Sequence, residues 1–219
     1  MREYKIYIYF FRIILKMLFA IFFIRYEIEG EENLDIINQT GKGALLASNH
    51  ISNLDPVMYM LIQKVPVSFF AKKILFSVPV LGWCIKKAAH VSVNREGADS
   101  AAMRQAISQI KDGMVLGIFP EGTRSIDGEI RPAKAGAGMI AYKSKAIVIP
   151  AAISGTREIL PKNRFVPRIS RVRIKIGQPL IFDDIYGLEN LKPEDEREAY
   201  KIITSKTMEE IRKLYESIR

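Results

Sequence analysis

The chain has 219 residues, a formal net charge of +9 and a pI near 9.6, and 48% of its residues are hydrophobic. This length suits one α/β domain with a sizeable core. The excess of positive charge calls for a polyanionic neighbour, which could be nucleic acid, an anionic membrane surface or a phosphorylated substrate. The single cysteine, Cys84, excludes an intramolecular disulfide and a cysteine-based zinc site, so we expect a protein of the cytoplasmic side.

The first 24 residues are far more apolar than the rest. Residues 6–24 are interrupted only by Arg12 and Lys16, and the uncharged run after Lys16 is eight residues long. A bilayer span needs about 20 apolar residues, so a simple transmembrane helix is disfavoured. Lys5, Arg12 and Lys16 fall within about 40° on a helical wheel and form a narrow basic stripe. We expect residues 1–25 to form a membrane-associated helix whose cations face lipid phosphates; a tilted span and a buried core helix are the alternatives.

From Gly43 onward, short apolar runs alternate with helical patterns, as is typical of βαβ units. Expected strands cover 44–48, 67–71, 90–93, 114–119, 146–153 and 172–176. Expected helices cover 56–64, an apolar stretch ending at Trp83, 98–111, 136–145 and 193–219. Residues 26–43 are interpreted as a strand that leaves the N-terminal segment, followed by a connection. The pattern predicts an α/β fold, and we expect a mixed, largely parallel sheet flanked by helices. We expect residues 26–219 to form a single domain.

His50 and Asp55 stand five residues apart in the segment SNHISNLDP. Five residues on one helix would point the two side chains apart, but at a strand-to-helix corner they can converge. The expected strand ends near Ser48, and Asp55 before Pro56 is typical of a helix N-cap with proline at the first position. His50 would then lie in a loop at the carboxyl end of a strand, where α/β sheets place their sites. Alternatively, Asp55 is only a helix cap and His50 a hydrogen-bonded loop residue.

A second cluster, FPEGTRS at residues 119–125, also follows an expected buried strand. It offers a glycine that lets backbone amides approach a ligand, a hydroxyl and a guanidinium suited to a phosphate. Arg95 follows the expected strand 90–93, and Lys134 precedes an expected helix. Each of these residues could separately be a turn residue or a surface charge. Together, three loops at one edge of the sheet predict an anion-binding site.

With these motifs the chain resembles the 1-acylglycerol-3-phosphate acyltransferases, within the wider glycerolipid acyltransferase family. The matching positions are Asn49, His50 and Asp55 in the first block, Arg95 in the second, 119–125 in the third, and 148–150 running on to Gly155 in the fourth. The blocks stand in the family's order and cover about residues 43–157. One departure is the lead-in to Arg95, which reads Val93-Asn94 where the family usually has an apolar or acidic residue.

The resemblance implies a glycerol-3-phosphate acyltransferase-like fold and a direct acyl transfer. The donor would be an acyl thioester, acyl-CoA or acyl-carrier protein, and the acceptor the sn-2 hydroxyl of lysophosphatidic acid, giving phosphatidic acid. His50 would be the general base and Asp55 its partner. The acceptor would be held by Arg95, Glu121, Gly122, Thr123, Arg124 and Lys134, with Glu121 orienting arginines or a hydroxyl. No metal and no cofactor beyond the donor is implied, and the enzyme would act at the cytoplasmic face of the cell membrane.

Three other interpretations stay open. The acceptor could be glycerol 3-phosphate or another lysophospholipid. The acid-free basic run at 162–175 could bind nucleic acid, although it suits an anionic bilayer equally and no recognition motif accompanies it, so we expect no nucleic-acid partner. A catalytically silent membrane-binding homologue is disfavoured by the intact His50 and Asp55.

Overall fold

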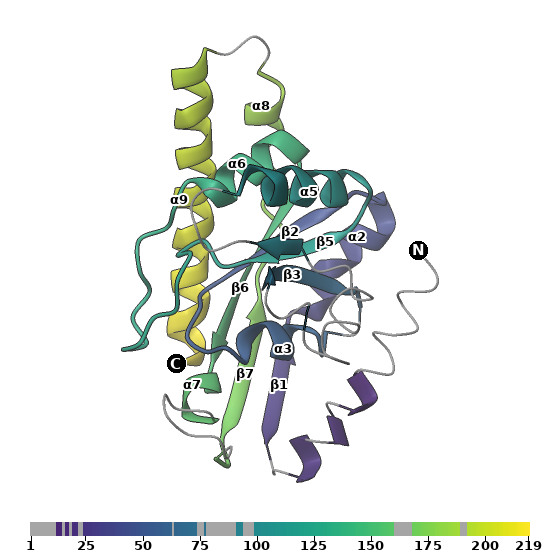
Figure 1. Cartoon of the computed structure of the whole chain (residues 1–219), viewed down its shortest axis with the longest axis vertical. Helices are drawn as coiled ribbons and strands as arrows, with labels where there is room; N and C mark the ends of the chain where they lie inside the picture. The colour runs from purple at the N-terminus through teal and green to yellow at the C-terminus, as the bar shows by residue number, and fades with distance from the viewer. Residues whose placement is uncertain are drawn as a thin grey trace.

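The computed structural model of the protein describes residues 12–14, 16, 17, 19–21, 24–62, 64–73, 77, 91–93, 99–159, 168–188 and 192–219. Within these ranges, seven strands form one sheet in the order β1-β7-β6-β2-β5-β3-β4 (Figure 1). They are β1 (Arg25–Glu29), β2 (Ala44–Ser48), β3 (Val67–Lys72), β4 (Val91–Val93), β5 (Val115–Ile118), β6 (Ile147–Ser154) and β7 (Arg171–Ile176). Neighbouring strands are parallel except β6 and β7, so the predicted mixed, largely parallel sheet is confirmed.

Helices cover both faces of this sheet. They are η1 (Glu31–Leu34), α2 (Asp35–Thr40), α3 (Asp55–Tyr59), α5 (Ser100–Lys111), α6 (Gly136–Ser144), α7 (Thr156–Ile159), α8 (Asp183–Tyr186) and α9 (Pro193–Ile218). One face packs against α2 and α3, and the other against α5, α6, α8 and α9, the last running along the sheet in Figure 1. The central strands are therefore buried on both sides.

Side chains of β2 and β6 alternate between the two faces of the sheet and so contribute to the hydrophobic core on each face. Leu46 and Ile149 belong to the cluster with α3, whereas Leu45 and Val148 belong to the cluster with α5 and α6. Successive side chains of a strand point to opposite faces, so a strand covered on both faces must be apolar throughout. This explains why 114–119 and 146–153 read as unbroken apolar runs.

The structure differs from the expected elements at α3, in the connection after β1, and at the short helices α7 and α8, which the pattern does not predict. The helix expected over 56–64 ends at Tyr59, since the chain turns at Met60 and Leu61 to reach β3. The expected connection after β1 contains η1 and α2. The apolar stretch ending at Trp83 lies outside the described residues.

The N-terminal segment is helical at the described positions between 12 and 21 and packs beside α3. Phe19 is buried in the core, with its ring edge-on to Tyr26 at a centroid distance of 6.2 Å. The guanidinium of Arg12 donates to the carbonyl oxygens of Met60 (2.8 Å) and Val65 (3.3 Å). The expectation that Arg12 faces lipid phosphates is therefore wrong, because its guanidinium donates to one carbonyl at the end of α3 and to another just before β3. Lys16 is exposed, and Lys5 lies outside the described residues.

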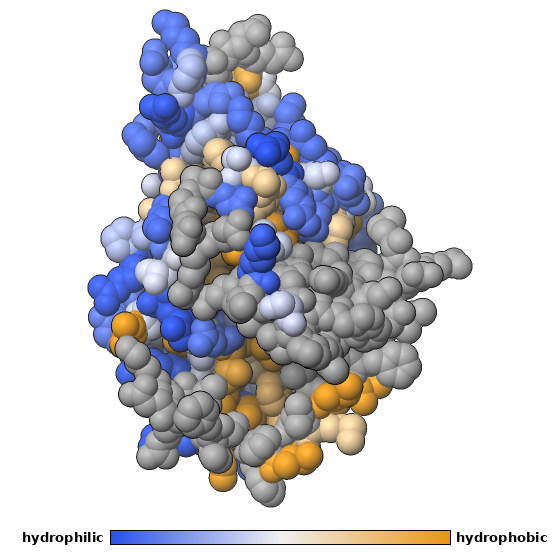
Figure 2. Space-filling view, in the orientation of Figure 1, coloured by the Kyte–Doolittle hydropathy of each residue, from blue (hydrophilic) through white to orange (hydrophobic). Residues whose placement is uncertain are grey.

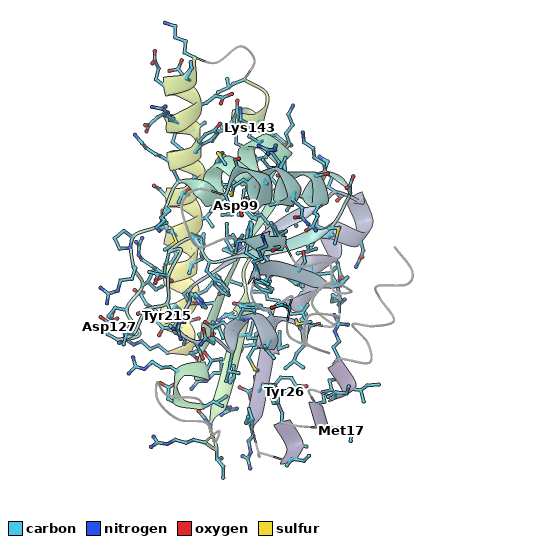
Figure 3. The ribbon with its side chains drawn as sticks, in the orientation of Figure 1. Met17, Tyr26, Asp99, Asp127, Lys143 and Tyr215 are labelled. Atoms are coloured by element: carbon cyan, nitrogen blue, oxygen red, sulfur yellow. The ribbon has the colours of Figure 1, made fainter. Side chains whose placement is uncertain are left out.

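The opposite side of this segment is apolar and exposed. The exposed side chains are Ile13, Ile14, Met17 and Ile21, with exposed fractions from 38% to 64%. Hydrophobic surface gathers at the lower right of Figure 2, and Met17 lies there, on the outer side of the segment, in Figure 3. No helix within the described ranges is both long enough and apolar enough to cross a membrane.

Candidate active site

Three chain segments meet where β2, β5 and β6 end. β2 pairs in parallel with both β5 and β6, so the three strands finish at the same edge of the sheet. The segment after β2 carries His50, the segment after β5 begins at Phe119, and the segment after β6 carries Thr156. The prediction that His50 lies at the carboxyl edge beside the 119–125 motif is confirmed. Arg95 lies outside the described residues.

His50 and Asp55 are in direct contact. The Nδ1 atom of His50 lies 2.8 Å from Oδ2 of Asp55, which also accepts the backbone N–H groups of Ile51 and Ser52 at 2.8 Å each. The other carboxylate oxygen, Oδ1, accepts the hydroxyl of Thr156 at 2.5 Å. Asp55 is fully buried, whereas the His50 side chain is 17% exposed. The buried carboxylate of Asp55, with donors on both of its oxygens, therefore holds the Nδ1 edge of the His50 imidazole, and the His50 side chain is still accessible from outside.

Asp55 does not cap α3. Leu54 occupies the N-cap position, Asp55 is the first helical residue and no side chain caps the helix. The carboxylate turns back to the backbone amides of the preceding loop, which offer it two donors in addition to the imidazole. The predicted N-cap is therefore wrong, although the predicted convergence of His50 and Asp55 is right.

The imidazole plane is held by aromatic stacking. The rings of His50 and Phe119 are 4.0 Å apart and within 10° of parallel, and Phe119 stacks on Phe69 at 5.5 Å. Nε2 of His50 makes no hydrogen bond to any residue that the structure describes. With a proton on Nδ1 directed at the carboxylate, Nε2 presents a lone pair that can accept a proton from a ligand.

Glu121 supports the backbone of His50. Its Oε1 accepts the N–H of His50 at 2.9 Å, and its Oε2 accepts the N–H of Arg131 at 2.8 Å. The side chain is 2% exposed, and burial raises the pKa of this carboxyl, with the two amide donors acting in the opposite direction. Both oxygens are thus engaged inside the protein, and Glu121 supports the backbone of His50 and Arg131 in place of the arginine side chains or hydroxyl that it was expected to orient. The N–H of Ser125 donates to the carbonyl of His50 at 2.7 Å, so this segment holds the His50 backbone from both sides.

The remaining predicted residues that the structure describes form an exposed polar rim, which consists of Gly122, Thr123, Arg124 and Lys134. Gly122 has φ +68°, and a Cβ there would lie 3.0 Å from Cδ of Lys134, so the lysine chain passes directly over the glycine. Thr123, Arg124 and Lys134 are exposed. Neither Arg124 nor Lys134 forms an ion pair within the part of the chain that the structure describes. These two cations are available to an anionic ligand.

The segment that carries this rim is tied to the rest of the protein. The hydroxyl of Tyr215, on α9, donates to the carbonyl of Gly128 at 3.0 Å, and Tyr215 and Asp127 lie close together in Figure 3. Ser125 donates to Asp127 at 2.8 Å and accepts the N–H of Gly128 at 3.0 Å. The rim is therefore exposed in its side chains but supported in its backbone.

Sequence reasoning missed Thr156, which contacts Asp55 across 101 positions of sequence. The only local signal was its place two residues after the end of β6, at the same sheet edge as His50. Among the described residues, no group of three or more histidine, cysteine or acidic side chains could hold a metal ion.

The comparisons with known proteins agree with the motifs. The family model described as Acyltransferase matches residues 25–154, which include His50, Asp55 and the 119–134 segment. The chain is 31% identical over 161 residues to the chloroplastic 1-acyl-sn-glycerol-3-phosphate acyltransferase LPAT1 of Arabidopsis thaliana, covering 72% of this chain and 44% of that protein. It is 32% identical over 142 residues to the 1-acyl-sn-glycerol-3-phosphate acyltransferase of Bacillus subtilis, covering 63% and 67%.

A solved structure shares the fold. The crystal structure of the 1-acyl-sn-glycerophosphate acyltransferase PlsC from Thermotoga maritima superposes with a TM-score of 0.70 and 27% sequence identity, covering 94% of this chain and 79% of that one. The chain spans about half the length of the plant relatives it matches, 44% to 55%. The resemblance predicted from the motifs is confirmed, and the chain belongs to the Acyltransferase family.

Proposed function

We propose that the protein transfers a fatty acyl chain from an acyl thioester to the sn-2 hydroxyl of lysophosphatidic acid, giving phosphatidic acid for phospholipid synthesis. The donor would be acyl-CoA or acyl-carrier protein. One observation carries the chemistry: Nδ1 of His50 is held at 2.8 Å by the fully buried Asp55, while the imidazole keeps an accessible edge. The proposed acceptor is taken from the names of the Arabidopsis and Bacillus relatives, which are 1-acyl-sn-glycerol-3-phosphate acyltransferases.

In the proposed reaction Nε2 of His50 removes the proton of the acceptor hydroxyl as its oxygen attacks the thioester carbonyl. The tetrahedral intermediate collapses, the carbon–sulfur bond breaks, and the leaving thiolate takes the proton from the imidazolium. Asp55 keeps the proton on Nδ1 and stabilises the positive imidazolium between the two steps. The substrate hydroxyl thus takes the place that a serine has in a hydrolase triad.

The exposed rim would bind the acceptor phosphate. Arg124 and Lys134 are exposed cations near the loop that holds His50, and Arg95 joins them on the strength of the motif resemblance. A guanidinium matches two phosphate oxygens at once, whereas an ammonium acts as a point charge. Gly122 and the hydroxyl of Thr123 complete the proposed phosphate site.

We further propose that the protein works at the cytoplasmic face of the cell membrane. The exposed apolar side chains Ile13, Ile14, Met17 and Ile21 would enter the acyl region, with Lys16 near the lipid phosphates. The chain would then divide into a membrane-associated segment at 1–25 and a single acyltransferase domain at 26–219. The net charge of +9 favours an anionic bilayer, and no nucleic-acid partner is proposed.

The test is a substrate panel with wild type and His50→Ala. Purified protein in detergent is given lysophosphatidic acid, glycerol 3-phosphate or lysophosphatidylcholine, each with acyl-CoA and with acyl-carrier protein. We expect wild type to acylate lysophosphatidic acid fastest, and His50→Ala to lose a factor of about 10²–10⁴ while its melting temperature and its binding to anionic liposomes are retained. Turnover by His50→Ala near the wild-type rate would remove the base assignment.

The panel also decides between the acceptors. If glycerol 3-phosphate or lysophosphatidylcholine is acylated faster than lysophosphatidic acid, the proposed acyl-transfer reaction stands, but the acceptor is that compound instead. Salt-sensitive binding to bare oligonucleotide without binding to anionic liposomes would instead favour the nucleic-acid interpretation.

A further inference from the structure

The carboxylate of Asp55 is held from two directions. All three donors on Oδ2 belong to its own loop, residues 50–52. Among the described residues, the one donor from elsewhere in the chain is the hydroxyl of Thr156, which lies 2.5 Å from Oδ1. An ionised carboxylate only accepts hydrogen bonds, so the threonine hydroxyl is the donor. Thr156 and Asp55 are both fully buried, so water does not compete for this bond.

The fold brings Thr156 to this place through a clamp between β2 and β6. The carboxamide of Asn49 donates to the carbonyl of Ile153 at 3.0 Å and accepts the N–H of Ile153 at 2.9 Å. This pair of bonds sets the spacing between the segment that leads to Asp55 and the segment that leads to Thr156.

Gly155 then turns the chain toward the carboxylate. It has φ +84°, and a Cβ there would lie 2.0 Å from the carbonyl oxygen of Arg171, so only glycine fits between β6 and β7. The next residue, Thr156, begins α7, and its hydroxyl reaches Asp55.

We propose that Thr156 is a positioning residue for the catalytic pair: its hydroxyl fixes the plane of the Asp55 carboxylate and, through it, the direction of the His50 imidazole. This inference rests on the proposed general-base role of His50. The loop donors all act on a single oxygen, Oδ2, and leave Oδ1 without a restraint, so they oppose only weakly a tilt of the carboxylate that pivots near Oδ2. A donor on Oδ1 opposes that tilt, and small errors in the placement of a reacting group are costly in rate.

The test compares Thr156→Val with Thr156→Ser. Valine keeps the shape of threonine but leaves Oδ1 of Asp55 buried without a donor, whereas serine keeps the hydroxyl. We expect Thr156→Val to lower kcat by about tenfold to 10²-fold with KM for the acceptor changed less than about twofold. Thr156→Ser should return kcat to within about threefold of wild type. Equal kcat in wild type and Thr156→Val would overturn the proposal.

A matched control separates positioning from general loss of stability. Thr207 on α9 is also buried, and its hydroxyl donates to the carbonyl of Ile203 at 2.7 Å. Thr207→Val should lower the melting temperature without lowering kcat. If Thr207→Val and Thr156→Val lose kcat in proportion to their loss in melting temperature, Thr156 has only a structural role.

A readout independent of activity tests the geometry itself. The chain has two histidines, so ¹⁵N-histidine labelling gives two imidazoles, and the spectrum of His50→Ala identifies the His50 signal. The Nδ1–H proton of His50 should resonate at a strongly hydrogen-bonded position in wild type and Thr156→Ser and should shift or broaden in Thr156→Val. An unchanged signal in Thr156→Val would contradict the inference even if His50 proves not to be the base. An active His50→Ala with a shifted signal in Thr156→Val would instead remove the proposed general-base role of His50 and keep the positioning.

Discussion

The loop 49–55 and the rim at 122–134 lie at the same edge of the sheet but differ in how their polar groups are satisfied. In the loop, Asn49 and Asp55 are buried and fully hydrogen-bonded within the protein. In the rim, Thr123, Arg124 and Lys134 are exposed. The groups proposed for proton transfer are thus arranged before substrate arrives, whereas the cations proposed for phosphate binding stand ready to exchange water for an anion.

Glu121 joins the two regions. It belongs to the same motif as the rim, yet it is buried and its carboxylate is bonded to the backbone of His50 and of Arg131. Changes in the buried loop should therefore act on kcat, changes in the rim on KM, and a change at Glu121 on stability as well.

The largest effect is expected at Asp55. Asp55→Asn can keep an oxygen toward His50 and the loop amides and turn its amide toward the hydroxyl of Thr156, which can accept. The variant should fold, but it cannot stabilise the imidazolium by charge. We expect kcat to fall by about 10²–10⁴-fold with KM nearly unchanged, measured by steady-state acyl transfer. A loss confined to KM would place Asp55 in substrate binding instead.

The next effect is expected at Arg124. Arg124→Gln removes one exposed cation of the rim and no internal ion pair among the described residues. A hydrogen bond to a charged group contributes about 1.5–3 kcal/mol, so KM for lysophosphatidic acid should rise about tenfold to 10²-fold while kcat is retained. Arg104→Gln, at an exposed position on α5, is the matched control and should leave KM unchanged. Equal effects of the two variants would mean that the rim acts only through overall charge.

A smaller effect is expected at Glu121. In Glu121→Gln one of the two backbone N–H groups, from His50 or Arg131, faces an amide donor in place of an acceptor. Leaving a buried donor unsatisfied costs about 1–3 kcal/mol in the free energy of unfolding, which urea titration measures. Glu129→Gln, at an exposed position in the same segment, should change stability little. A Glu121→Gln protein as stable as wild type would show that these two bonds are dispensable.

The smallest effect is a difference in pH dependence between wild type and Glu121→Gln. Burial raises the pKa of Glu121 above the ordinary value for a glutamate, so between that value and the raised pKa the folded protein binds more protons than the unfolded chain. The contribution of this group to stability is therefore greatest at low pH and falls as pH rises through the raised pKa. Melting temperatures of both proteins measured from pH 4 upward should show a stability gap that is widest at the acid end. A gap that narrows toward low pH would contradict the direction of the shift.

Much of the site was predictable because its signals are local. The unbroken apolar runs of β5 and β6 indicate strands buried on both faces, and polar residues just after such strands lie at one edge of a parallel sheet. The strand-to-helix corner allowed His50 and Asp55 to converge, and the structure shows that they do. The backbone contacts of Glu121 do not follow, because its sequence position suggested that it orients arginines or a hydroxyl, and only its burial and its observed partners replace that role.

The sequence by itself determined the α/β class, the mixed, largely parallel sheet and the loops that carry His50, Asp55 and the 119–125 motif. These depend on periodicity and on turn residues, which act over a few positions. Only the tertiary structure decided that β6 lies beside β2, that Arg12 turns inward to the end of α3, and that Thr156 reaches Asp55 across 101 residues. Such contacts depend on strand order and on the exclusion of water from a shared core, and no local pattern encodes either.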